Sequence, residues 1–378
     1  MKLILVDNSS KMLLNFRKEF IRKLAKTVDV YVLCPLNEED KVELISLGVK
    51  QCFDNTYLRR QGINPIHDYK LFRFYQQCFH DVCPDIVFNY TIKCTIWASL
   101  AAKRSGVKSI FSMITGLGYA FTDVTQGGLK KRLVNYFVKK LYKKSLTHNK
   151  KVFFLNNDDS QLFGSLGITS LSQSVVLNGE GVDLDYFYYV DNMPEKLSII
   201  MLSRLLKDKG ILEYYKAAKI LKSRYGDQLS FKLAGSIDNN PTSLSQSDLN
   251  EIIESGCVDY LGSLSDVREA IKSSSVLLLP SYREGTPRCI LEAMSMGRAI
   301  ITTDAPGCRE TVIDGENGFL ISVKSVNEIV DSVEKLLKDQ NLLVSMGKCS
   351  RRIAENKYDA HKVNRHILNE IIQGFSHV

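Results

Sequence analysis

The chain of 378 residues is longer than one hydrophobic core usually serves, which predicts two domains. Its composition, 44% hydrophobic and 24% charged, is typical of a globular protein, and no apolar run approaches the about 20 residues that a transmembrane helix needs. The net charge of +8 is uneven, because residues 1–175 hold 26 Lys and Arg against 14 Asp and Glu, whereas residues 176–378 hold 24 against 28. The first half is therefore expected to meet an anionic partner.

The nine cysteines are scattered, with no CxxC pair and no cluster of histidines beside them. Reduced thiols are expected, rather than disulfides or a zinc site. Met1 and Lys2 lead directly into the apolar run 3–7, which indicates a buried strand rather than an export signal. The expected location is the cytoplasm, and any contact with a membrane would be peripheral.

Apolar runs alternate with stretches of helical periodicity along the first half of the chain. Strands are predicted at 3–7, 28–34, 49–53, 85–90, 109–114, 151–156 and 174–178, and helices at 11–26, 66–80, 92–105, 128–145 and 158–166. Strands that are apolar throughout and alternate with helices are typical of parallel sheets covered on both faces. Residues 1–178 are therefore predicted to form a Rossmann-like α/β domain.

Glycines and cations follow several of these strands. Lys93 comes just after the strand that ends at residue 90, and Gly116, Leu117 and Gly118 follow the next strand. Glycines at the carboxyl end of a strand permit a close approach of a ligand, although a simple tight turn explains them equally well.

The segment 130–151 is strongly basic and contains no acidic residue. Tyr136 and Phe137 interleave at helical spacing with its cations, which include Lys130, Lys131, Arg132, Lys139, Lys140, Lys143 and Lys144. A helix with cationic and aromatic faces suits an anionic bilayer surface. A solvated helix over the domain core is the simpler alternative, and no nucleic-acid motif accompanies the basic residues.

The alternating pattern returns in the second half. Strands are predicted at 197–205, 229–234, 258–261, 275–281, 299–303 and 318–322, and helices near 209–224, 244–255, 265–273, 288–296, 325–338 and 341–356. The segment 179–194 between the two runs has no periodicity and is interpreted as a linker. The predicted domains are residues 1–178 and 179–357, with a last helix in 358–378. Asn317 and Gly318, where the last predicted strand begins, are typical of a hairpin turn.

Arg204 and Lys209 stand five residues apart where the first strand of the second half gives way to a helix. Both could converge on a diphosphate beside the helix N-terminus, or both could be solvated surface cations. Gly235 and Gly262 follow the next two strands and suit a backbone approach to a nucleotide base. Asp183 lies two residues before a second aspartate, and it is expected to cap the linker turn rather than to bind a metal.

Two carboxylates, Glu284 and Glu292, stand eight residues apart, the first in a loop after a strand and the second inside the following helix. In an open α/β sheet, ligands bind where such loops meet helix N-termini. On spacing alone, two helix-side carboxylates, one stabilising the helix dipole, are the simpler interpretation. Gly285 permits a close backbone approach, however, and Pro287 can begin a helix without losing a hydrogen bond.

The segment 282–293 resembles the E-x7-E motif of retaining glycosyltransferases of family 4, which have the GT-B fold. Residues 179–187 resemble the hinge of that family, and residues 306–310 read P-G-C-R-E. The latter is similar to a bacterial subgroup that extends undecaprenyl-diphosphate-linked sugars for O-antigen, capsule or N-glycan, N-acetylgalactosaminyltransferases included. The resemblance implies two Rossmann-like domains that face each other across a cleft, with a C-terminal helix that crosses back to the first domain.

The resemblance also implies a reaction. A hexose or N-acetylhexosamine, with GalNAc favoured, would move from a UDP-sugar to a polyprenyl-diphosphate-linked saccharide, with retention at the anomeric carbon and without a metal or other cofactor. Arg204 and Lys209 would stabilise the departing diphosphate, Glu284 would hold the donor sugar and Glu292 would hold the ribose. Further donor contacts are expected from Gly285, Thr286, Pro287, Arg288, Ile290, Leu291, Gly235 and Gly262. The wall on the acceptor side is expected at Lys93, Gly116, Leu117 and Gly118.

Two alternatives stay open from the sequence. A related enzyme could use a soluble acceptor such as a sugar phosphate, although the basic first half argues against it. A non-catalytic protein that binds a nucleotide sugar or an anionic polymer would be expected to have lost Glu284, Arg204 or Lys209, and all three are present. The expected partners are a UDP-sugar, an undecaprenyl-diphosphate-linked saccharide and the anionic inner face of a bacterial cell membrane.

Overall fold

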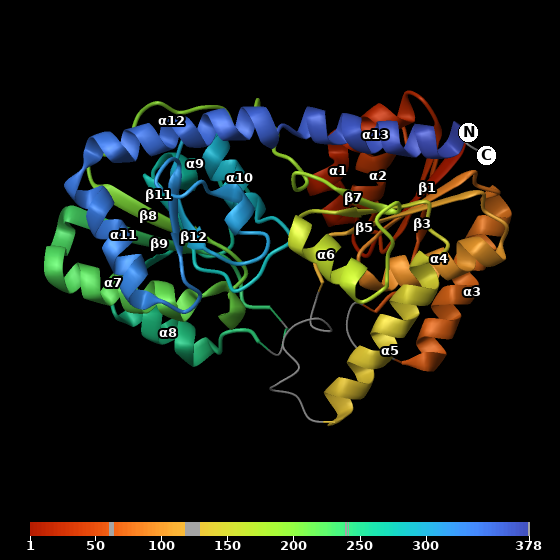
Figure 1. Cartoon of the computed structure of the whole chain (residues 1–378), viewed down its shortest axis with the longest axis horizontal. Coiled ribbons are helices and arrows are strands. Elements are labelled where there is room, and N and C mark those ends of the chain that lie inside the picture. The colour runs from red at the N-terminus through yellow and green to blue at the C-terminus, as the bar shows by residue number, and fades with distance from the viewer. Residues whose placement is uncertain (60–63, 118–128, 239, 241, 377–378) are drawn as a thin grey trace. The chain divides into compact units, whose positions relative to one another are not determined.

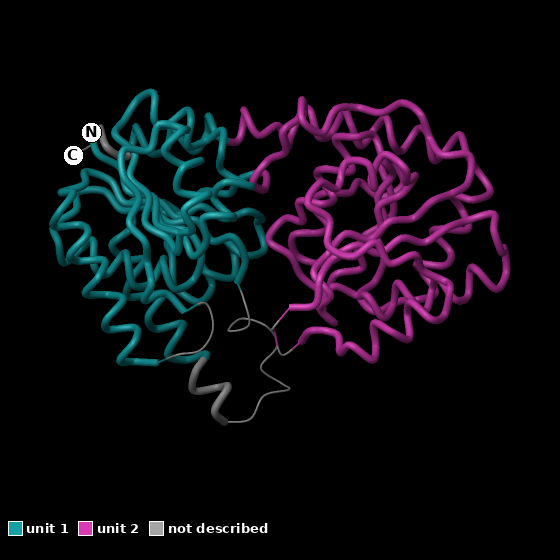
Figure 2. The backbone as a smooth tube through the Cα atoms, turned by 180° about the vertical axis from the view of Figure 1, so that it is seen from behind, with its two compact units in different colours: residues 1–177, 364–378 teal, residues 178–363 magenta. Residues whose placement is uncertain are grey.

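The computed structural model describes residues 1–59, 64–117, 129–238, 240 and 242–376, and of residues 129–134 and 374–376 the backbone alone. The chain divides into two compact units (Figure 2). Unit 1 comprises residues 1–177 and 364–378, and unit 2 comprises residues 178–363. The last helix is thus shared, because the chain returns to unit 1 within it.

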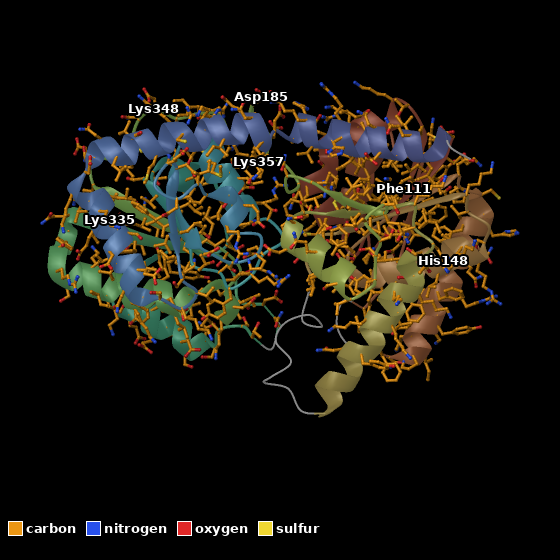
Figure 3. The ribbon with its side chains drawn as sticks, in the orientation of Figure 1. Phe111, His148, Asp185, Lys335, Lys348 and Lys357 are labelled. Carbon is orange, nitrogen blue, oxygen red and sulfur yellow. The ribbon has the colours of Figure 1, made fainter. Side chains whose placement is uncertain are left out.

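Unit 1 contains one parallel sheet with the strand order β3-β2-β1-β4-β5-β6-β7. Its strands are β1 (Lys2–Val6), β2 (Asp29–Cys34), β3 (Gln51–Asp54), β4 (Ile86–Tyr90), β5 (Ser109–Ile114), β6 (Lys151–Phe154) and β7 (Ser174–Val176). Phe111 of β5 is wholly buried in the core (Figure 3). The sheet lies where the apolar runs predicted it.

Helices cover the sheet of unit 1 (Figure 1). They are α1 (Ser10–Ala25), α2 (Glu38–Ser46), α3 (Pro65–Val82), α4 (Ile92–Arg104), α5 (Leu129–Leu146) and α6 (Asn157–Ser165). The sequence did not predict α2, because Leu44 is its one buried residue and a single buried position leaves no helical period to detect.

Unit 2 contains a second parallel sheet with the order β10-β9-β8-β11-β12-β13. Its strands are β8 (Leu197–Leu202), β9 (Leu229–Ala234), β10 (Asp259–Tyr260), β11 (Val276–Leu279), β12 (Ala299–Thr303) and β13 (Gly318–Ile321). The α-helices that follow are α7 (Ile211–Tyr225), α8 (Gln246–Glu254), α9 (Arg268–Lys272), α10 (Arg288–Ser295), α11 (Val326–Lys338), α12 (Gln340–Lys357) and α13 (Ala360–Ser376). Short 3-10 turns include η3 (Lys207–Lys209) and η5 (Arg309–Thr311).

The hairpin turn predicted at Asn317 and Gly318 is wrong, because β12 and β13 pair in parallel. Asn317 is wholly buried, and its side chain accepts from Ile313 N at 2.8 Å and donates to Thr311 O at 3.2 Å. Gly318 begins β13, where a Cβ would lie 1.8 Å from the carbonyl O of Ile300. The glycine therefore serves a close approach of two strands rather than a turn.

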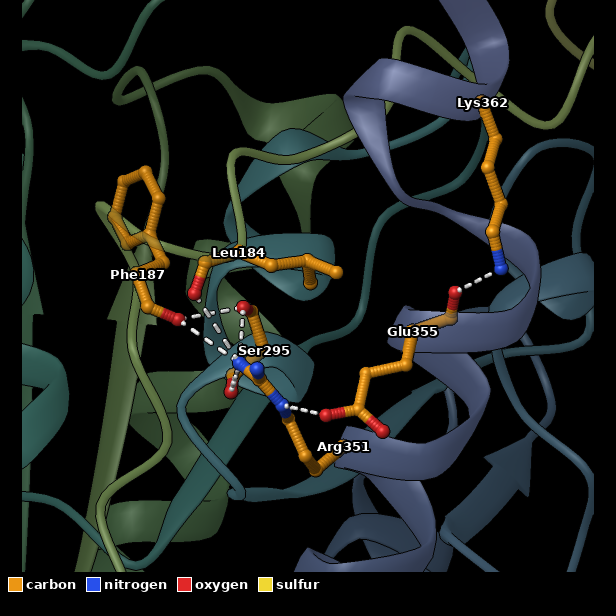
Figure 4. Close-up of polar contacts among 6 residues, drawn as sticks. All are labelled: Leu184, Phe187, Ser295, Arg351, Glu355 and Lys362. Carbon is orange, nitrogen blue, oxygen red and sulfur yellow. Dashed lines mark hydrogen bonds and ion pairs between the residues drawn. The ribbon is translucent and has the colours of Figure 1, made fainter.

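The linker at 179–194 belongs to unit 2 and is fastened to it by side chains distant in sequence. Arg351 of α12 donates from Nη1 to the carbonyls of Leu184 and Phe187 at 3.4 Å and to that of Ser295 at 2.8 Å (Figure 4). Ser295 of α10 donates from Oγ to Phe187 O at 2.6 Å. Tertiary hydrogen bonds thus give this segment its order, although its sequence has no periodicity.

Candidate functional site

The second-half residues predicted to bind a ligand gather at the carboxyl edge of the sheet of unit 2. Arg204 and Lys209 follow β8, Gly235 follows β9, and Glu284 follows β11. These strands are neighbours and all parallel, so the loops after them lie at the same edge. Glu292 lies on α10, the helix that leaves this edge after β11.

Lys209 and Glu284 form an ion pair that is largely withdrawn from water. Lys209 Nζ lies 2.6 Å from Glu284 Oε1, and the two side chains are 12% and 16% exposed. Gly210, directly after η3, has φ +78°, and a Cβ there would lie 2.2 Å from Pro280 O. A glycine is required at this point, and it lets η3 approach the end of β11 closely enough for the pair to form.

The backbone of Glu284 is braced by residues 304–311, which follow β12 and which we call the bracing loop. Glu284 N donates to Pro306 O at 2.9 Å. Gly307 has φ +81°, and a Cβ there would lie 2.3 Å from the carbonyl O of Glu284. The Pro-Gly pair of the P-G-C-R-E segment therefore supports the candidate catalytic carboxylate through backbone contacts.

Glu292 lies one turn after Arg288 on α10, and Arg288 Nε is 3.4 Å from Glu292 Oε1. Burial raises the pKa of Glu292 above its ordinary value, and Arg288 opposes this shift. Pro287 is the N-cap residue of α10, as its position before the helix suggested. Ile290 and Leu291 are wholly buried in the core of unit 2, and their side chains pack the helix onto the sheet.

Arg204 differs from Lys209 in its surroundings. Its Nη1 lies 2.8 Å from Asp238 Oδ2, and its side chain is 59% exposed. Gly235 has φ +151°, and a Cβ there would lie 1.8 Å from Ser203 O. Its N–H donates to Gly262 O at 2.8 Å, so the two glycines predicted near a base are hydrogen-bonded to each other.

Thr286 and Gly285 lie beside the linker. Thr286 Oγ1 donates to Gly285 O at 2.8 Å. A Cβ on Gly179, whose φ is +61°, would lie 2.8 Å from Thr286 Cγ2. The linker therefore packs directly against the segment that joins the two carboxylates.

Sequence reasoning missed Tyr282 and its partners. Tyr282 Oη donates to Glu213 Oε1 at 2.8 Å, and its N–H donates to Asp208 O at 2.9 Å. Burial and the neighbouring Glu213 raise the pKa of Tyr282 well above its usual range. Asp208 lies in η3 beside Lys209, so Tyr282 helps to hold the turn that carries the cation. The only signal in the sequence is the position of Tyr282, two residues before Glu284.

Two cysteines lie near Glu284 but are poor nucleophiles. Burial raises the pKa of Cys308 to about 12, and it also raises that of Cys289. Glu284 contributes to both shifts by like-charge repulsion. Both thiols therefore stay neutral at physiological pH, and a thiolate mechanism is not supported.

In unit 1, Lys93 lies in the first turn of α4, where its Nζ is 3.2 Å from Asp68 Oδ1. The two side chains are 18% and 6% exposed, a pairing that the sequence did not suggest. Gly116 has φ +155°, and Leu117 is buried. Gly118 lies outside the described residues. Near the carboxyl end of β4, the charge of Lys93 is thus already paired with that of Asp68.

Helix α5 buries one face and exposes aromatic rings on another. Tyr136 and Phe137 are 53% and 57% exposed, whereas Tyr142 is wholly buried. Lys140 Nζ lies 4.9 Å from the ring centroid of Tyr136. Lys140, Lys143 and Lys144 are exposed and Lys139 is half-buried, while the side chains of Lys130, Lys131 and Arg132 lie outside the described part of the chain. None of the helices in that part combines the length and apolarity that a bilayer crossing requires.

Among the described side chains, no three or more His, Cys, Asp and Glu residues lie in a group that could hold a metal ion. Asp183 Oδ1 accepts from the N–H groups of Asp185 and Tyr186 at 3.0 and 2.9 Å. Asp183 therefore caps the linker turn, as predicted.

Two protein-family models match the chain: glycosyl transferase 4-like over residues 2–156 and glycosyl transferases group 1 over residues 191–353. The N,N'-diacetylbacillosaminyl-diphospho-undecaprenol alpha-1,3-N-acetylgalactosaminyltransferase of Campylobacter jejuni is 28% identical over 362 residues, which are 92% of each chain. The UDP-Gal:alpha-D-GlcNAc-diphosphoundecaprenol alpha-1,3-galactosyltransferase of Escherichia coli is 27% identical over 284 residues, or 71% of this chain and 70% of that one. The crystal structure of Anabaena Alr3699/HepE in complex with UDP is similar with a TM-score of 0.77 at 16% identity, covering 99% of this chain and 100% of that one. This likeness confirms the GT-B fold class.

Proposed function

Since the chain is a glycosyltransferase with a 4-like domain in residues 2–156 and a group 1 domain in residues 191–353, we propose that it moves a hexose or N-acetylhexosamine from a UDP-sugar to a polyprenyl-diphosphate-linked saccharide. The observation that carries the proposal is the secluded Lys209–Glu284 pair at the carboxyl edge of the sheet of unit 2. GalNAc is the favoured sugar, because the relative that aligns with 92% of this chain is named as an N-acetylgalactosaminyltransferase. The related Anabaena structure holds UDP, which supports a uridine nucleotide as the leaving group.

In the proposed chemistry the bond between the sugar and the diphosphate breaks, and its electron pair leaves with UDP, which thereby gains one negative charge. An ammonium has three N–H donors, so Lys209 can keep one on Glu284 and direct the others to phosphate oxygens. Arg204 would add a second cation, and together they would stabilise the charge that develops on the departing UDP. Such a reaction needs leaving-group stabilisation more than a strong general base, and we propose that it proceeds with retention at the anomeric carbon.

The two carboxylates would bind different parts of the UDP-sugar. Glu284 Oε1 is engaged by Lys209, and its carboxylate would hold hydroxyls of the sugar. Glu292, within the first two turns of α10, would accept hydrogen bonds from the ribose. The raised pKa of Glu292 fits a carboxylate whose solvation is to be replaced by ligand hydroxyls.

The acceptor is proposed from the relatives and from the charge of the first half. Both the Campylobacter jejuni and the Escherichia coli relative are named for undecaprenyl-diphosphate-linked substrates. Residues 1–175 carry 26 Lys and Arg against 14 Asp and Glu, which suits a diphosphate and an anionic lipid surface. We therefore place the reaction at the inner face of a bacterial membrane, in the assembly of a surface polysaccharide such as O-antigen or capsule.

The function is tested by incubating the protein with each of UDP-GalNAc, UDP-GlcNAc, UDP-Gal and UDP-Glc and a panel of undecaprenyl-diphosphate-linked saccharides. We expect one donor and acceptor pair to give a product heavier by one sugar, detected by mass, with an α-linkage by NMR. Sugar phosphates serve as the soluble-acceptor control. Transfer to these alone would contradict the lipid-linked acceptor, and a β-linkage would contradict retention.

A further inference from the structure

The end of the bracing loop remote from Glu284 is fixed by two consecutive side chains. Tyr358 Oη and Lys357 Nζ both donate to the backbone carbonyl O of Glu310, the latter at 2.8 Å. Tyr358 is 1% exposed, and Lys357 Nζ also lies 5.0 Å from its ring centroid. Lys357 is the last residue of α12 (Figure 3). A partly buried carbonyl that accepts two donors has little freedom to move.

Between Glu310 and Glu284 the bracing loop is closed by its own hydrogen bonds. The N–H groups of Cys308 and Arg309 both donate to Ala305 O at 3.0 Å. Arg309 also donates from Nε to Asp304 Oδ1 at 2.7 Å. The loop is therefore compact, and a displacement at Glu310 is carried to the Pro306 carbonyl that holds the N–H of Glu284.

Lys357 and Tyr358 lie a few residues before the chain leaves unit 2 for unit 1. The chain enters unit 2 at residue 178 and leaves it at residue 363. Val182 N donates to Tyr358 O at 2.7 Å, and Ala360 N donates to Val182 O at 3.0 Å, so the entering and leaving segments are paired. A Cβ on Gly181 would lie 2.6 Å from Ala360 Cα, which shows how closely the segments approach.

We propose that Tyr358 and Lys357 are positioning residues for Glu284, acting through the Glu310 carbonyl and the bracing loop. The inference rests on the proposed function, because that function gives the donor sugar to Glu284. In that function Arg204 and Lys209 hold the diphosphate and Glu292 holds the ribose, whereas the bracing loop holds the backbone of Glu284. Loss of the Tyr358 hydroxyl therefore misaligns the sugar and slows its transfer, but it leaves the binding of UDP intact.

The test compares two Tyr→Phe variants of the full chain. Tyr358→Phe keeps the buried ring and removes one donor to Glu310. Tyr214→Phe is the matched control, because Tyr214 is also buried in unit 2 and its hydroxyl donates to the carbonyls of Ile199 and Lys232 at 3.1 and 2.8 Å. Both variants lose hydrogen bonds to backbone carbonyls, but those of Tyr214 lie on β8 and β9.

In Tyr358→Phe we expect kcat for sugar transfer to fall about tenfold, because small misplacements of a reacting group are costly. The KM for the UDP-sugar and the Kd for UDP should change by less than about twofold, and Tyr214→Phe should keep kcat within about twofold of wild type. Lys357→Met should repeat the loss of kcat, and it serves in place of Tyr358→Phe if that variant does not fold.

Equal kcat values for folded Tyr358→Phe and Tyr214→Phe would overturn the positioning role. A parallel loss of UDP affinity in Tyr358→Phe would overturn it as well, because the effect would then extend to the whole site. Failure of the proposed function and failure of the positioning role give different results. Wild-type protein that transfers no sugar refutes the proposed function, whereas active wild type with an unaffected Tyr358→Phe refutes only this inference.

Discussion

At the scale of single residues, Glu292 is a largely buried carboxylate whose negative charge lowers the stability of the fold. Its side chain is 14% exposed, and the Arg288 guanidinium 3.4 Å away only partly opposes the rise in pKa that burial causes. A carboxyl whose pKa is higher in the folded than in the unfolded chain lowers the free energy of unfolding as the pH rises through that interval. At neutral pH the ionised Glu292 is therefore destabilising, which is expected of a group kept for a ligand.

Glu292→Gln should consequently raise the Tm at pH 8, and the gain should be smaller at pH 5, because the cost of the ionised Glu292 is lost as the pH falls through its raised pKa. The variant should also bind UDP more weakly, because it loses the carboxylate proposed for the ribose. Calorimetric melting at both pH values and titration with UDP measure these effects.

Glu334→Gln provides a control of opposite sign. The pKa of Glu334 is lowered by its hydrogen bond with Arg224, so its charge stabilises the fold above the unfolded pKa, and its loss should lower the Tm at pH 8. A Glu292→Gln variant that is less stable than wild type at pH 8 would contradict the interpretation that the ionised Glu292 destabilises the fold and is kept for a ligand.

The sequence identified individual candidate residues of the site, but it did not show which of them form ion pairs. The sequence singled out Lys209 and Glu284, yet 75 positions separate them, and only the order of β8 beside β11 brings them to 2.6 Å. The Asp68 partner of Lys93 was not foreseen for the same reason, since an ion pair across elements leaves no periodic signal. Motif residues are visible in a sequence, whereas their neutralising partners depend on packing.

At the scale of elements, strands were easier to predict than short helices. A parallel strand such as β11 is buried along its whole length and reads as an unbroken apolar run. Helix α2 has one buried residue and carries no such signal. At Gly318 the local turn chemistry was misleading, because the same residue type serves a turn and a close contact between strands.

Helix α5 is the element that we propose to touch the membrane. Its exposed aromatic residues, Tyr136 and Phe137, stand among the exposed lysines 140, 143 and 144. Aromatic rings favour the interface, and each lysine near an anionic surface contributes about 1 kcal/mol. The Lys139/Lys140/Lys143/Lys144→Glu variant should therefore lose binding to phosphatidylglycerol vesicles, measured by flotation.

A second quadruple variant separates the position of the charges from their number. Lys11, Lys26, Lys50 and Lys108 are exposed on other parts of unit 1, and their replacement by Glu changes the net charge equally. This control should keep most of the vesicle binding. Equal losses of vesicle binding in both variants would show a general effect of charge. Wild-type protein that does not bind anionic vesicles would contradict the proposed membrane contact.

At the scale of the whole molecule, the two compact units divide the charge and the proposed tasks. The half up to residue 175 has 12 more basic than acidic residues, and the rest has 4 more acidic than basic ones. The candidate donor residues all belong to unit 2, and the basic helix α5 belongs to unit 1. We interpret this division as one unit for the nucleotide sugar and one for an anionic, lipid-linked acceptor.

The central claim is that Lys209, paired with Glu284, stabilises the leaving diphosphate, and the transfer rate of Lys209→Met tests it most directly. Lys207→Met is the matched control, because Lys207 lies in the same short turn and is exposed. Removing a group that stabilises transition-state charge should lower kcat about 100-fold or more, while the control keeps the wild-type rate. A folded Lys209→Met protein that transfers sugar as fast as Lys207→Met would contradict the account.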